Sequence, residues 1–130
     1  MSLDGACISI ADTILEFANV VICQMPEPQA LETLRQTIEL AISVWNAQTL
    51  ATPVWNQPEH LNELSRLIAL SASPPMAAAF EALRSAKLSR FAADARVVCE
   101  WQVVADEHGR ARFDCSARLP PAPPVAVGRV

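Results

Sequence analysis

The chain has 130 residues, of which 52% are apolar and 18% are charged. This is the length of one domain with a real core, because a chain of this size buries about two-thirds of its unfolded surface on folding. The most apolar stretch, residues 8–23, contains two acidic side chains and is shorter than the ~20 apolar residues of a membrane-spanning helix. No basic residue precedes Arg35, so a secretory leader is not expected. These features predict a soluble, cytoplasmic protein whose four cysteines are reduced.

Apolar residues at helical spacing predict four helices before residue 94. Ser9 is expected to cap the first helix, which ends before the prolines at positions 26 and 28. The second helix is predicted from Leu31 to Thr49. Its middle, which includes Trp45, is apolar nearly all round, and this is typical of a central helix with neighbours on several sides.

The third and fourth helices are predicted from their start signals as well as their spacing. Asn56 is followed by a proline and a glutamate, and we expect it to cap a helix that carries leucines at positions 61, 64, 67 and 70. Ser73 is expected to cap the fourth helix, with Pro74 at its first position. Phe80 and Lys87 then fall on one face of that helix.

The period of the apolar residues changes to two after residue 94, which predicts a β-hairpin. Asp106 and Gly109 indicate a type I turn with a bulge, in a register that pairs Val103 with Phe113 and Trp101 with Cys115. All odd-numbered apolar residues, from Val97 through Cys99 to Ala117, are expected to face the core, with Trp101 substantially buried.

The predicted fold class is therefore α+β. About four helices, arranged like a bundle, precede a C-terminal antiparallel β-hairpin and a Pro-rich extended tail. We place a single domain at residues 1–118 and the tail at residues 119–130, where four prolines favour an extended, polyproline-like chain.

Common catalytic and cofactor motifs are missing from the sequence. There are two histidines, no C-x-x-C and no G-x-S-x-G, and the glycines at positions 5, 109 and 128 cannot form a phosphate-binding loop. We accordingly predict no catalytic residue, no cofactor and no metal site, and lean against an enzyme.

One polar cluster remains as a possible anion or partner contact. Lys87, Arg90 and Arg96 lie at the predicted helix-to-strand junction, where the alternative interpretation is a charged joint that fixes the hairpin against the fourth helix. Trp55, in a Pro-flanked connection, is added as a possible partner contact. It belongs to a Val-Trp-Asn sequence that also occurs at 44–46, a recurrence too short to indicate a repeat.

The leading functional hypothesis is a non-enzymatic protein–protein interaction or regulatory module that assembles with itself or with another protein. The alternative is a small-molecule-binding domain or enzyme with a pocket between the helices and the hairpin. A homodimer is expected, with pairing of the first hairpin strands as one route, since two strands alone are marginal in water. Nucleic acid is disfavoured by the net charge of −4, and no membrane contact is expected.

Overall fold

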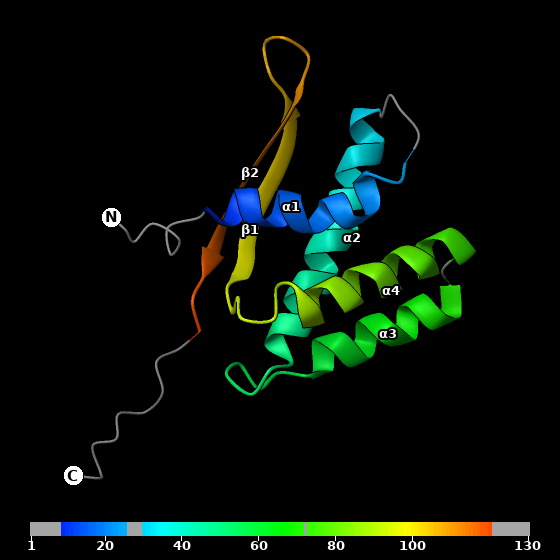
Figure 1. Ribbon diagram of the computed structural model, residues 1–130, viewed down its shortest axis with the longest axis vertical. Coiled ribbons are helices and arrows are strands. Elements are labelled where there is room, and N and C mark those ends of the chain that lie inside the picture. Colours follow the sequence, from blue (N-terminus) through cyan, green and yellow to red (C-terminus); the bar gives the residue numbers. More distant parts are fainter. Residues whose placement is uncertain (1–8, 26–29, 72, 121–130) are drawn as a thin grey trace, which may run out of the picture.

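The computed structural model describes residues 9–25, 30–71 and 73–120 and has the predicted α+β class (Figure 1). Its elements, in chain order, are α1 (Ile10–Ile22), α2 (Leu31–Leu50), α3 (Glu59–Ser71), α4 (Pro74–Ser89), β1 (Val97–Ala105) and β2 (Ala111–Arg118). Most of the predicted tail, together with Cys7, lies outside the described residues. Among the residues that are described, no helix combines the length and apolar character that crossing a bilayer requires.

Two of the three residues predicted to cap a helix do so through their side chains. Ser9 accepts a hydrogen bond from the backbone N–H of Asp12, and Ser73 does the same for Met76. The prediction for Asn56 is wrong, because this residue has a left-handed φ of 55° and lies in the turn before α3. Its N–H donates to the carbonyl of Thr52, so Asn56 helps to close the chain after α2.

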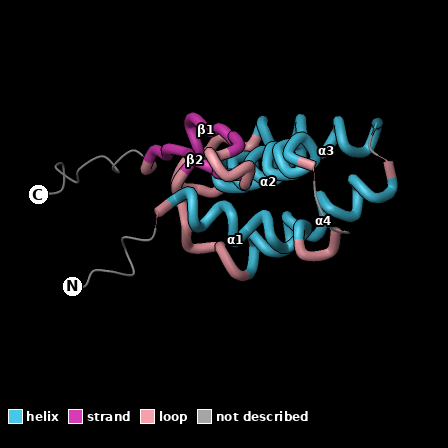
Figure 2. Tube along the Cα trace, turned by 90° about the horizontal axis from the view of Figure 1, so that it is seen from above, coloured by secondary structure: helices cyan, strands magenta, loops and turns pink. Residues whose placement is uncertain are grey.

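Helix α2 is the centre of the fold, as its apolar middle predicted. It contacts α1, α3, α4 and β1, and Figure 2 shows α1 and α4 in one layer with α2, α3 and the hairpin in the other. Trp45 of α2 is fully buried, with its ring edge-to-face against Phe17 of α1 at 5.1 Å and against Phe91 at 5.8 Å between centroids. The aromatic side chains of the core therefore pack around Trp45.

The hairpin has the predicted turn and register. Val103 pairs with Phe113 and Trp101 with Cys115. Gly109 has a φ of 77°, the left-handed value that the bulge of this turn requires, and the N–H of Asp106 donates to the carbonyl of Arg110. The local chemistry of the turn thus fixes how the two strands align.

A β-bulge between Val98 and Glu100 corrects the predicted face of β1 at its start. Val97 and Val98 are both buried, whereas Cys99, expected in the core, is exposed. Trp101 packs against the core but is only partly buried, so the prediction of substantial burial is too strong.

The bulge coincides with a contact from α2. The side-chain amide of Asn46 accepts from the N–H of Val98 at 2.8 Å and donates to the carbonyl of Val98 at 3.0 Å. Asn46 therefore pairs with β1 as a residue of a neighbouring strand would, and it satisfies two backbone groups that would otherwise lie unbonded at the sheet edge.

We expect Asn46→Ala to lower the free energy of unfolding by about 2–4 kcal/mol, because it leaves the N–H and the carbonyl of Val98 without their partner. Urea denaturation measures the effect. Asn62→Ala, at an exposed position of α3, is the control and should change stability by less than about 0.5 kcal/mol. Equal stability of the Asn46 variant and the native protein would contradict a bonding role for this amide.

Candidate functional site

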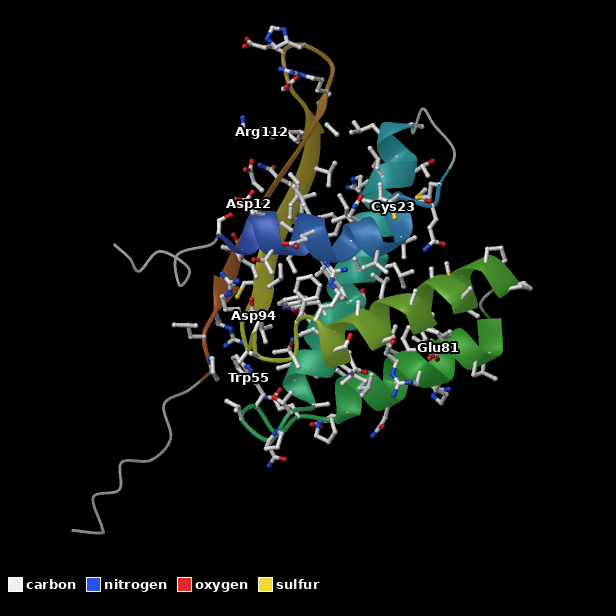
Figure 3. All side chains as sticks on the ribbon, viewed as in Figure 1. Asp12, Cys23, Trp55, Glu81, Asp94 and Arg112 are labelled. Carbon is white, nitrogen blue, oxygen red and sulfur yellow. The ribbon has the colours of Figure 1, made fainter. Side chains whose placement is uncertain are left out.

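The structure does not bring the four candidate residues together on one surface. Lys87 and Trp55 are buried, at 3% and 8% exposure, and both point into the junction between α4 and β1. Arg90 and Arg96 line a pocket beside that junction. Figure 3 shows Trp55 and Asp94 at this end of the hairpin, away from its tip.

The buried pair holds the backbone of the junction. The Lys87 amine donates to the carbonyls of Phe91 and Asp94 at 2.8 and 2.7 Å. The Trp55 indole N–H donates to the carbonyl of Ala95 at 2.8 Å. These geometries match the alternative interpretation of the cluster, a joint that fixes the hairpin to the helices.

The tryptophans of the two Val-Trp-Asn sequences bind the same segment, the connection that leads into β1. Trp45 donates its indole N–H to the carbonyl of Arg96 at 2.7 Å, one residue beyond the carbonyl that Trp55 binds. Their asparagines differ, since Asn46 bonds to Val98 and Asn56 lies in an exposed turn. The recurrence therefore has a structural counterpart in its tryptophans, although the two segments adopt different conformations.

The ionisation of Lys87 reflects its surroundings. Burial lowers the pKa of this amine from 10.5 to about 8, although the nearby charge of Asp94 acts in the opposite direction. The ammonium lies 4.3 Å from the centroid of the Trp45 ring, which attracts a cation through its π-face. A neutral amine keeps two N–H donors, so both carbonyl contacts can survive deprotonation.

Asp94 and Arg96 form a tight ion pair next to Lys87. The guanidinium donates to both carboxylate oxygens, at 2.9 and 2.6 Å, and the backbone N–H of Arg96 adds a third hydrogen bond at 3.1 Å. Burial alone would raise the pKa of Asp94, but these bonds and the charge of Arg96 outweigh it and the pKa falls. The same contacts raise the pKa of Arg96.

A pocket of about 650 Å³ lies where α1, the end of α4 and the connection to β1 meet. Its charged side chains face one another in pairs, because Arg90 lies 3.6 Å from the Glu16 carboxylate and Arg96 lies 2.6 Å from that of Asp94. Polar groups thus converge in a concave site, as ligand binding requires. A charged ligand would have to separate one of these pairs, which weakens the case for a ready-made anion site.

A second surface was not found from the sequence. A groove of about 370 Å³ runs between α2 and α3, and Leu64 and Leu67 are among its apolar lining. Leu67 is 47% exposed, and Leu70, one helical turn further along α3, is 72% exposed. The sequence does contain a signal for this apolar surface, since no charged residue occurs between Arg66 and Glu81.

Comparison with known proteins adds no assignment, since no protein-family model, curated protein or solved structure matches the chain. In the part of the chain that the structure describes, no three His, Cys, Asp or Glu side chains gather where they could hold a metal ion. The surfaces themselves therefore carry the functional argument.

We expect Lys87 to make the protein more stable as the pH rises from 8 to 9. The folded-state pKa lies below the unfolded one, so the unfolded chain holds more protons in this range and the free energy of unfolding increases with pH, by about 1 kcal/mol. Cys115 acts in the opposite sense, because burial raises its pKa from 9.0 to about 11 and the unfolded thiol begins to ionise first. This smaller effect is common to the native protein and the Lys87 variant, so it cancels in their comparison. Urea denaturation at pH 8 and 9 should show the rise in the native protein and not in Lys87→Met, and the same rise in both would contradict the assignment.

The thiols are expected to differ in reactivity. Cys23 and Cys99 are exposed, whereas Cys115 is partly buried with a raised pKa, so it holds less of the reactive thiolate. Alkylation by iodoacetamide at pH 8, followed residue by residue by mass spectrometry, should be at least about tenfold slower at Cys115. In urea the three alkylation rates should become similar. Rapid alkylation of Cys115 in the folded protein would contradict its partial burial in β2.

Proposed function

We propose that the protein is an interaction module that holds an amphipathic helix of a partner protein in the groove between α2 and α3. The observation that carries this proposal is the exposure of Leu67 and Leu70 along one line of α3 that continues the groove. Large apolar side chains that are contiguous and solvent-exposed mark contact surfaces more often than they serve the fold.

The shape of the groove suits a helix. Two helices form its walls, and its buried lining residues, Ala47 and Leu50, are apolar, whereas Ser43, His60 and Glu63 are exposed polar residues. Its lining comes from Ser43, Asn46, Ala47 and Leu50 of α2 and from His60, Glu63, Leu64 and Leu67 of α3. Leu70 extends the apolar line by one further turn, so the surface offers anchors at the spacing that a partner helix presents.

Charge selects the kind of partner. Together α2 and α3 carry four glutamates and two arginines, and Arg66 is already paired with Glu63 at 2.7 Å. A partner helix with basic residues beside its apolar stripe would complement this rim, while a second copy of the same surface would set acidic groups against each other. The junction pocket, whose charged side chains are paired among themselves, gives weaker support to the alternative function of small-molecule binding.

The proposal is tested with a synthetic amphipathic peptide of about 18 residues, in which leucines at helical spacing are flanked by lysines, and with a twin in which every lysine is glutamate. Fluorescence anisotropy should show at least about tenfold tighter binding of the basic peptide. The double variant Leu67→Asp/Leu70→Asp should lose about tenfold or more of that affinity.

Leu88→Asp is the matched control, because Leu88 is 59% exposed on α4 away from the groove. It should change the affinity by less than about twofold. Circular dichroism verifies that both variants remain folded. Equal binding of the two peptides, or equal binding by the double variant and the control, would overturn the proposal.

A further inference from the structure

The two edges of the hairpin sheet are treated differently by the fold. The start of β1 is occupied by the amide of Asn46, and α2 packs against the same strand. The sheet has only the order β1–β2, so residues 9–25, 30–71 and 73–120 place no strand against the outer edge of β2. Helix α1 in turn contacts β2. The stretch that remains available for pairing is therefore the part of the β2 edge near the hairpin tip, whereas the sequence favoured the first strand.

The backbone of β2 offers a regular set of hydrogen-bonding groups at this edge. The Asp106–Arg110 pair is hydrogen-bonded, and in an antiparallel ladder such pairs alternate with pairs whose groups face outward. The N–H and carbonyl groups of Phe113, Cys115 and Ala117 therefore point away from β1. A second strand could use those of Phe113 and Cys115 without any change in the hairpin.

The side chains beside this edge alternate in charge. Arg112 and Asp114 lie on the outer face of the sheet, 3.2 Å apart, and are 64% and 47% exposed. An alternating pair of this kind is complementary to itself when the strand is turned end for end, because each charge then meets the opposite one. Charged residues on an edge usually discourage pairing, but here they discriminate between registers.

We propose that β2 pairs antiparallel with the β2 strand of a second copy of this chain, about a two-fold axis at Phe113, to form a four-stranded sheet. In this register Arg112 of each copy faces Asp114 of the other, in a position where opposing side chains lie close together. Phe113 of each copy exchanges its outward N–H and carbonyl with the other. The contact is isologous, as a closed dimer requires.

The other registers that keep the same faces aligned are less favourable. An axis at Asp114 places two carboxylates opposite each other, and an axis at Cys115 places Arg112 opposite Arg118. An axis at Ser116 also pairs opposite charges, but it centres on the half of β2 that α1 crosses, so the two α1 helices would meet there. The tip half of the hairpin extends beyond α1, so that helix does not cross the edge of β2 there (Figures 1 and 3).

The contact is small, since about five residues of each copy form the ladder. An interface of this size falls below that of stable complexes, so association should depend on concentration in the micromolar range or above. The surface lies apart from the groove between α2 and α3. Failure of one proposal therefore leaves the other standing.

Sedimentation equilibrium of the full chain, from about 10 μM to about 1 mM, tests the proposal. Arg112→Asp should weaken dimerisation at least tenfold, because it sets two pairs of carboxylates against each other. The exchange variant Arg112→Asp/Asp114→Arg restores both opposite-charge pairs and should return the affinity to within about threefold of the native value. Arg110→Asp, which changes charge beside the turn, should have less than a threefold effect.

A monomer at every concentration would overturn the proposal, and so would an exchange variant as weak as Arg112→Asp. Hydrogen exchange distinguishes a second copy from another segment of the same chain on the edge. The amide protons of Phe113 and Cys115 should become protected only as the concentration rises. Protection that is equal at 10 μM and 1 mM would assign the edge to the chain's own residues and reject the dimer.

Discussion

The hairpin is joined to the helices by side chains that bind the backbone at the beginning of β1. Lys87, Trp55 and Trp45 donate to four carbonyls between residues 91 and 96, and Asn46 pairs with both polar groups of Val98. The backbone groups of this connection that are buried need partners within the protein, and these side chains supply them. The position of the sheet, its bulge and the choice of its open edge all depend on this arrangement.

Patterns confined to neighbouring residues were sufficient for most of the fold. Helical spacing predicted four helices and the central place of α2, and the turn residues predicted the hairpin register. The bulge could not be predicted in this way, because it coincides with the contact between Asn46 and Val98, which are 52 residues apart. Alternation assigned Cys99 to the core because it carries no information about such a contact.

At the candidate site, too, local patterns predicted some features, while others depend on contacts between distant parts of the chain. The sequence pointed to the junction through Lys87 and Trp55, but their burial depends on how α2, α4 and the connection to β1 meet. Conversely, the leucines of α3 read as core residues on a helix with a wide apolar stripe. The remaining elements cover only part of that stripe, so Leu67 and Leu70 stay exposed. Exposure is a property of the assembled helices and cannot be read from one helix alone.

The distance along the chain between the partners at the junction also has a kinetic consequence. The four helices and the hairpin contain mostly local contacts, whereas Trp45 and Arg96 are 51 residues apart. Bringing them together closes a long loop, whose entropic cost is met before the hydrogen bonds and ring contacts form. We expect docking of the hairpin on α2 to be the slow step of folding. Because the indoles of Trp45 and Trp55 both donate to the connection that enters β1, their fluorescence should report on this step.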